Sequence, residues 1–253
     1  MTTEPLTLLG LCAAAFVAGV VDAIAGGGGL LTLPALLLAG LPVPLALGTN
    51  KGQAVFGSAT ALLTFARADK IERTRLKWLF LPGFIGSLLG AAAVVLLAPA
   101  LLRPVVLVLL IAVAAFLALR PPLQVPTQPT GGNPALRMVL LALGIGAYDG
   151  FFGPGTGTFL IIGLVALLGD DLTRGSAHAK VVNFASNLAA MLLFLQRGTI
   201  VWSIALPMAL LQATGGLVGA KLAVRGGDGL VRKVVLLVVA ALCARLGWDL
   251  LRG

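Results

Sequence analysis

A glycine-rich interruption occurs twice inside apolar sequence, and it constrains this chain more than any other feature. The first copy spans residues 22–29 and the second spans residues 149–157. The copies match at an offset of 127 residues, and the match continues along the following segments at an offset of 129. Matched positions are Gly19 with Gly146, Asp22 with Asp149, Gly26 with Gly153, Gly28 with Gly155, Lys51 with Lys180, and Gly86 with Gly215. Interrupted hydrophobic segments at corresponding places in two halves indicate a transporter's binding site. The sequence therefore predicts a membrane carrier with an internal repeat.

The composition excludes a water-soluble globule. Of the 253 residues, 59% are hydrophobic and 11% are charged, and the mean hydropathy is +1.06. A soluble domain has about 25% charged residues. The chain suffices for roughly eight spans of about 20 residues each. We therefore expect an all-α, polytopic integral membrane protein in contact with the lipid bilayer.

Apolar runs define the expected organisation. Spans are predicted at 6–25, 45–66, 76–97, 101–119, 135–152, 176–196, 200–223 and 231–251. Two shorter apolar pieces, at 30–41 and 157–169, follow the glycine breaks. They are too short to cross about 30 Å of hydrocarbon, so we expect half-spanning or re-entrant helices. The predicted units are a first repeat (1–120), a Pro/Gly-rich linker (121–134) and a second repeat (135–253).

Charge placement predicts the sidedness. The net charge of +9 does not indicate nucleic-acid binding, because the basic residues lie in short connections that are typical of cytoplasmic loops. The segment Arg67–Lys77 carries five basic and two acidic residues, which places it in the cytoplasm. With eight crossings, both termini and the linker are then cytoplasmic, and the halves are related by an axis along the membrane normal. If a short piece completes a crossing, the repeats could instead be inverted.

The glycine breaks are the first candidate binding groups. Bare backbone N–H groups, together with the N-terminus of a following helix, make an anion site without needing a cation. The candidates are Gly26, Gly27, Gly28, Gly29, Gly153, Gly155 and Gly157. The alternative is a tight turn or close helix contact that requires glycine. Glycines in the third and seventh spans, such as Gly86 and Gly215, are assigned to helix packing.

Polar residues in the second and sixth spans are the next candidates. Lys180, Asn183 and Asn187 form one polar stripe on a helix in an otherwise apolar span. Lys51 matches Lys180 across the two halves. Ionisable groups within a span usually face the protein interior or a cavity. The alternative is that both lysines extend toward the lipid headgroups.

Three titratable residues are candidates for coupling or gating. Asp22 and Asp149 directly precede the glycine breaks. They could carry a proton, pair with Lys51 and Lys180, or cap a broken helix. His178, the only histidine, could titrate near neutrality. No metal site, cofactor motif or catalytic set is evident, so we expect no enzyme activity.

In this order and spacing, the motifs resemble the sulfite exporter TauE/SafE family over nearly the whole chain. The residues that carry the resemblance are Gly26–Gly29, the stretch Gly48-Thr49-Asn50-Lys51, the Gly153, Gly155 and Gly157 series, and Lys180, Asn183 and Asn187. The resemblance implies a bacterial inner-membrane protein that exports sulfite, sulfoacetate or related organosulfur anions. The site residues that it implies are Asn50, Lys51, Lys180, Asn183 and Asn187.

The leading interpretation is thus a secondary transporter for small anions across the cytoplasmic membrane. In the expected mechanism, Lys51 and Lys180 supply positive charge while Asn183 and Asn187 donate hydrogen bonds. A carrier or channel for another small anion or organic acid is the alternative. The substrate, the coupling ion, the direction and a homo-oligomeric state are left open.

Overall fold

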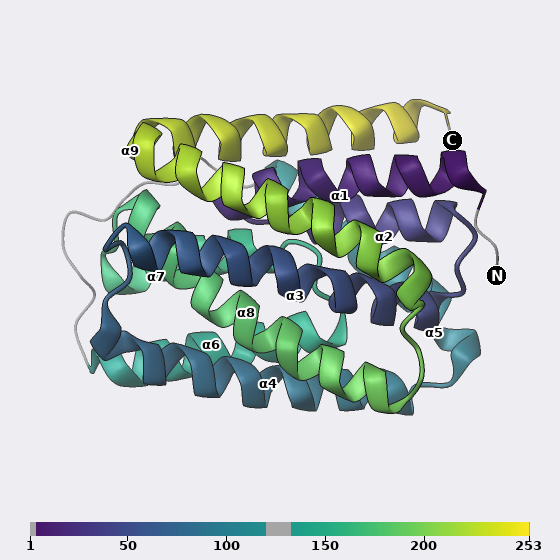
Figure 1. Ribbon diagram of the computed structural model, residues 1–253, viewed down its shortest axis with the longest axis horizontal. Coiled ribbons are helices and arrows are strands. Elements are labelled where there is room, and N and C mark those ends of the chain that lie inside the picture. Colours follow the sequence, from purple (N-terminus) through teal and green to yellow (C-terminus); the bar gives the residue numbers. More distant parts are fainter. Residues whose placement is uncertain (1–3, 120–132, 253) are drawn as a thin grey trace.

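The computed structural model describes residues 4–119 and 133–252, and this part of the chain is helical, with no strand. The all-α prediction is therefore confirmed. The elements are α1 (Pro5–Ala25), α2 (Gly29–Leu38), α3 (Val43–Arg67), η1 (Arg73–Arg75), α4 (Leu76–Leu96), α5 (Pro99–Leu119), α6 (Pro134–Phe151), α7 (Thr156–Leu168), α8 (Leu172–Gln196) and α9 (Trp202–Arg252). The last predicted pair of spans forms α9, which reverses direction at Gly227 (φ 57°, ψ −159°) (Figure 1).

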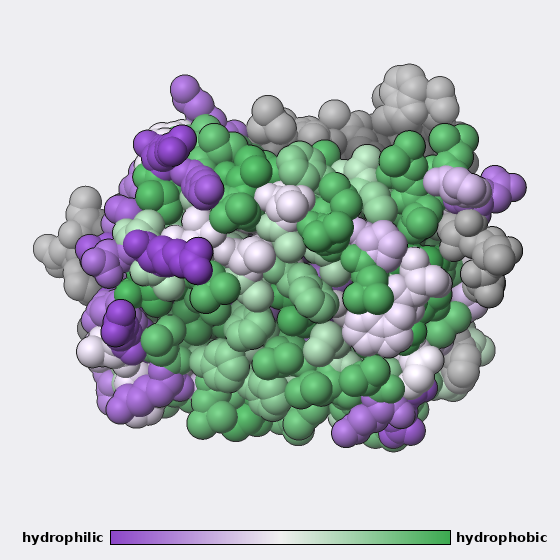
Figure 2. Space-filling view, in the orientation of Figure 1, coloured by the Kyte–Doolittle hydropathy of each residue, from purple (hydrophilic) through white to green (hydrophobic). Residues whose placement is uncertain are grey.

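Several helices meet the length and hydropathy expected of a membrane span. Among the described residues, the five that do are Pro5–Ala25, Arg73–Leu96, Pro134–Phe151, Leu172–Gln196 and Trp202–Val231. α3 has 25 residues but carries a polar stretch, and the apolar part of α5 is shorter. Apolar side chains also cover the middle of the face in Figure 2, with polar groups gathered toward both ends. The chain is a multi-pass membrane protein, and the number eight stays a prediction.

The two short apolar pieces turn back rather than cross. α2 has 10 residues and α7 has 13, about 15 and 20 Å at 1.5 Å per residue. α2 returns to the end of the molecule at which α1 begins (Figure 1). α7 returns to the start of α6, where the Arg137 side chain donates a hydrogen bond to the Leu167 carbonyl. The expectation of re-entrant helices after the breaks therefore holds.

These returns bear on the expected sidedness. Because α2 brings the chain back, only α3 separates the start of α1 from the basic loop Asp69–Arg75. The start of α1 and the end of α9 consequently lie at the end of the molecule opposite to that loop (Figure 1). The start of α6 lies at the loop's end, and most of the predicted linker is outside the described residues. α1 and α6 run in opposite directions, so an axis along the membrane normal does not relate the halves.

Glycine faces join helices from the two predicted halves. A Cβ added at Gly86 of α4 would lie 2.2 Å from the Leu143 carbonyl oxygen of α6. One added at Gly215 of α9 would lie 2.2 Å from the Phe16 carbonyl oxygen of α1. In lipid the hydrophobic effect does not hold helices together, and close backbone packing at small residues takes its place. The predicted packing role of these glycines is confirmed, and the chain packs as one interlocked body.

Candidate functional site

The two glycine breaks touch each other inside the helical body. Gly26 has φ 75° and ψ 177°, a conformation that is essentially restricted to glycine. A Cβ there would lie 2.2 Å from the carbonyl carbon of Gly157. α2 and α7 both begin at this contact, with Gly28 and Gly155 at their N-caps. The positive dipole ends of two half-helices therefore converge on one place.

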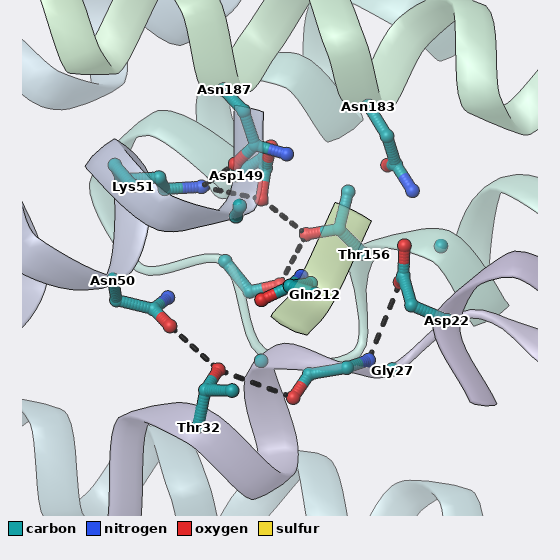
Figure 3. A pocket seen from close by; sticks show the side chains of 15 residues that line it. Asp22, Gly27, Thr32, Asn50, Lys51, Asp149, Thr156, Asn183, Asn187 and Gln212 are labelled. Carbon is teal, nitrogen blue, oxygen red and sulfur yellow. Dashed lines mark hydrogen bonds and ion pairs between the residues drawn. The ribbon is translucent and has the colours of Figure 1, made fainter. Parts of the chain in front are cut away.

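A small polar cavity lies where the breaks meet (Figure 3). Its volume is about 30 Å³, enough for two or three waters at about 10–15 Å³ each. The lining residues are Asp22, Gly27, Gly28, Gly29, Thr32, Asn50, Lys51, Ala54, Asp149, Gly153, Thr156, Gly157, Asn183, Asn187 and Gln212. Most of the predicted binding residues are thus brought together. A larger guest requires the side chains to move.

Both lysines are buried and paired, so neither extends to the headgroups. The Lys51 Nζ lies 2.7 Å from the Asp149 Oδ1, and their side chains are 3% and 5% exposed. The Lys180 Nζ lies 2.8 Å from the Asp22 Oδ2. Each pair joins residues of different predicted halves. Pairing, one of the alternatives open for the aspartates, is therefore observed.

The two aspartates have different surroundings. Asp149 also accepts hydrogen bonds from the hydroxyls of Thr156, at 2.9 Å, and Ser186. Asp22 accepts the backbone N–H of Gly28 at 3.3 Å, and its side chain is 18% exposed. Lys180 also donates to the Asp22 carbonyl at 2.6 Å. Lys180 itself is fully buried and does not line the cavity.

The amides divide into fixed and unpaired groups. Asn50 accepts from Thr32 at 2.6 Å and from Gln53 at 3.2 Å, so its carbonyl is committed to the protein. The carbonyl oxygens of Asn183 and Gln212 have no hydrogen-bond partner among the described residues, although these residues are only 4% and 3% exposed. Buried polar groups are nearly always paired. Two unpaired amide oxygens in the lining of a cavity therefore indicate a site for a polar guest that donates hydrogen bonds.

Sequence reasoning missed some residues of this site. Thr32, Thr156 and Gln212 line the cavity, and Ser186 bonds to Asp149. Gln212 matches Gly83 at the offset of 129, so a search based on paired positions passes over it. The signal that would have found it is a lone amide within an apolar span.

Other predicted residues lie outside the cavity lining. Gly26 and Gly155 shape the turns instead. His178 lies at the loop end, where its Nδ1 is 2.7 Å from the Asp170 Oδ2 and its Nε2 accepts the Glu72 backbone N–H at 3.2 Å. Arg75 joins the same network, 2.8 Å from Asp170. The structure thus separates His178 from the cavity and places it in a link between the basic loop and α8.

This link predicts a pH-dependent stability. Burial alone would raise the pKa of the Asp170 carboxyl, but the hydrogen bond of His178 and the charge of Arg75 outweigh it and lower that pKa below its ordinary 3.8. A lowered pKa stabilises the folded state above the ordinary value, and the contribution is lost as the pH falls through the folded value. We expect Asp170→Asn to lower the melting temperature at pH 7, with the gap to wild type closing below about pH 4.

The matched control for this measurement is Asp171→Asn. Asparagine caps a helix about as well as aspartate, so the cap at the start of α8 is kept and little change is expected at either pH. A gap for Asp170→Asn that stays constant with pH would contradict the assignment.

Comparisons with known proteins agree with the membrane architecture. Residues 11–246 match the family model described as Sulfite exporter TauE/SafE. The chain is 39% identical to "Probable membrane transporter protein ORF9" of Sinorhizobium sp over 93% of this chain and 90% of that protein. It is 38% identical to "Probable membrane transporter protein" of Haemophilus influenzae over 92% of both chains. It is 37% identical to "Probable membrane transporter protein YfcA" of Escherichia coli strain K12 over 97% of this chain and 91% of that protein.

No solved structure gives a significant match. A family match over nearly the whole chain, together with relatives of similar length, determines the class of protein, whereas the printed names of the relatives give no substrate. The chain belongs to the TauE/SafE family and is a membrane transporter rather than an enzyme.

Proposed function

We propose that this transporter moves sulfite or related small organosulfur oxo-anions outward across the cytoplasmic membrane. The observation that carries the proposal is the convergence of two half-helix N-termini on a small polar cavity. Helix N-termini offer unpaired N–H groups and a positive dipole end to an anion. The match to the TauE/SafE family model adds support. Another small anion or organic acid is the alternative cargo.

The paired lysines change the expected mechanism. Each lysine is neutralised by an aspartate, so attraction depends on the helix ends and on donors that remain free. Lys51 lines the cavity and also donates to the Asn187 Oδ1 at 3.2 Å. An anion held there would take donors from Lys51, Asn187 and Asn183. Lys180 does not line the cavity, so its charge reaches the anion only through its ion pair with Asp22.

The interlocked packing favours alternating access over a channel. The cavity has room for only two or three waters, whereas a conducting pore needs a continuous path. We place the basic loop Asp69–Arg75 in the cytoplasm, which puts the start of α1 and the end of α9 outside. The contacts of Gly86 with Leu143 and of Gly215 with Phe16 join matching positions, which supports an inverted duplication. Two such units would rock about the shared site. A homo-oligomer stays a prediction.

The proposal is tested by counterflow of labelled anions in proteoliposomes. We expect saturable exchange of sulfite, methanesulfonate and sulfoacetate, with no exchange of choline. Asn183→Asp keeps the shape of the side chain but adds a negative charge to the cavity, so anion exchange should fall at least tenfold. Asn133→Asp changes an exposed N-cap in the same way and should leave exchange unchanged. If the wild type does exchange choline, and Asn183→Asp keeps that exchange, the result would favour a cationic cargo.

A further inference from the structure

The cavity and its surroundings hold as many positive side chains as negative ones. Asp22 comes from α1, Lys51 from α3, Asp149 from α6 and Lys180 from α8. The other elements that line the cavity contribute uncharged groups, namely Thr32 of α2, Thr156 of α7 and Gln212 of α9. The charges therefore balance when no anion is present.

An anion that enters a balanced buried site leaves one negative charge uncompensated. An unpaired charge in a low-dielectric interior carries a large desolvation penalty. Protonation of one aspartate restores the balance and frees the charge of its lysine for the anion. The site thus favours uptake of an anion together with a proton.

The surroundings of the two aspartates identify the proton acceptor. Asp149 accepts from Lys51 and from two hydroxyls, and hydrogen bonds to a carboxylate favour its charged form. Asp22 accepts one ammonium and one long backbone hydrogen bond, at 3.3 Å. Its side chain is 18% exposed, against 5% for Asp149. Asp22 is therefore the more accessible of the two carboxylates and accepts fewer hydrogen bonds.

We infer that Asp22 binds a proton when the cargo anion binds, so that the transporter carries an anion and a proton together. This inference rests on the proposed function. A neutral carboxyl is a hydrogen-bond donor and a carboxylate is not, so protonation brings a donor to a cavity that has unpaired oxygens on Asn183 and Gln212. Lys180 keeps its 2.6 Å bond to the Asp22 carbonyl and stays in place. Net outward flux then requires an anion gradient that exceeds the inward proton gradient.

The test uses proteoliposomes and labelled methanesulfonate, which stays monovalent through the neutral pH range. Wild type should exchange methanesulfonate at equal pH on both sides. With the outside one pH unit more acid, it should accumulate the anion inside by up to about tenfold, the limit for one coupled proton. Asp22→Asn mimics the neutral carboxyl, so it should keep exchange at equal pH and lose acid-driven accumulation. Asp22→Glu should restore accumulation.

Two further variants keep the test decisive. Asp22→Asn leaves Lys180 unpaired, so the double variant Asp22→Asn with Lys180→Gln preserves the charge balance if the single variant does not fold. It should show no acid-driven accumulation, and it should exchange more slowly than Asp22→Asn because no lysine charge is then freed for the anion. Asp171→Asn changes an exposed carboxylate and should accumulate like wild type.

The failures are distinguishable. Wild-type exchange with no response to acid, or acid-driven accumulation by Asp22→Asn or by the double variant, would overturn the coupling and leave the transporter proposal standing. Absence of methanesulfonate exchange in wild type would overturn both.

Discussion

Gly26→Ala is expected to prevent accumulation of the folded transporter. The added methyl would lie 2.2 Å from the backbone of Gly157 and Thr158, and backbone cannot move aside without separating the two breaks. The conformation itself, φ 75° and ψ 177°, costs a non-glycine residue about 1–3 kcal/mol before any clash. Clash and strain together should exceed about 4 kcal/mol, which is exceptional for one substitution. Detergent-extracted monodisperse protein and its melting temperature are the measurements.

Gly40 provides a matched control for this prediction. It also has a positive φ, 85°, but nothing lies within 4 Å of an added Cβ. Gly40→Ala should therefore cost only backbone strain of about 1–2 kcal/mol, and the protein should still fold. Gly29→Ala gives an intermediate case, because its Cβ would lie 3.3 Å from the Pro154 Cα. Equal effects of Gly26→Ala and Gly40→Ala would show that contact between the breaks is unimportant.

Lys51→Met is expected to abolish exchange and to destabilise the protein strongly. The substitution leaves Asp149 as a buried carboxylate without its ammonium partner. Breaking a buried ion pair from one side typically costs about 3–5 kcal/mol, and at about 2–4 °C per kcal/mol the melting temperature should fall by roughly 10 °C. Exchange should be lost because Lys51 is the lysine that lines the cavity.

Two comparisons separate the effect of breaking the ion pair from the effect of losing the lysine itself. Lys51→Met combined with Asp149→Asn removes both charges, so it should recover most of the stability but none of the exchange. Arg174→Met breaks an exposed pair with Asp171, 3.7 Å apart with side chains 60% and 48% exposed, and should cost at most about 1 kcal/mol. A double variant no more stable than Lys51→Met would argue against a stabilising pair.

Much of the fold could be predicted because it depends on local pattern. Apolar runs mark the long helices, and the lengths of α2 and α7 show that they cannot cross. Glycines four residues apart in α4 and α9 mark faces that pack closely. The direction of each helix could not be predicted in the same way. It depends on whether the chain, after α1 and α2, lies on the opposite side of the membrane or returns to the side on which it started.

The sequence indicates which residues belong to the candidate site, but not which of them pair with each other. Lys51, Asn183 and Asn187 stand out because polar groups are costly inside a span. Which aspartate meets which lysine depends on packing between segments, since Lys51 and Asp149 are separated by 98 positions. Gln212 has a glycine, Gly83, at the matching offset, so the repeat does not point to it. His178 falls near the start of the predicted span 176–196, but its burial beneath the basic loop follows from the position of η1, which no local pattern encodes.

The contact between α1 and α9 has a consequence for biogenesis. Phe16 and Gly215 meet backbone to backbone, so the first helix to leave the ribosome must wait for nearly the whole chain before its close partner is synthesised. Until then its small-residue face is covered by lipid or by an insertion factor. Premature termination before residue 215 should consequently leave a nascent chain that the quality-control proteases of the membrane degrade.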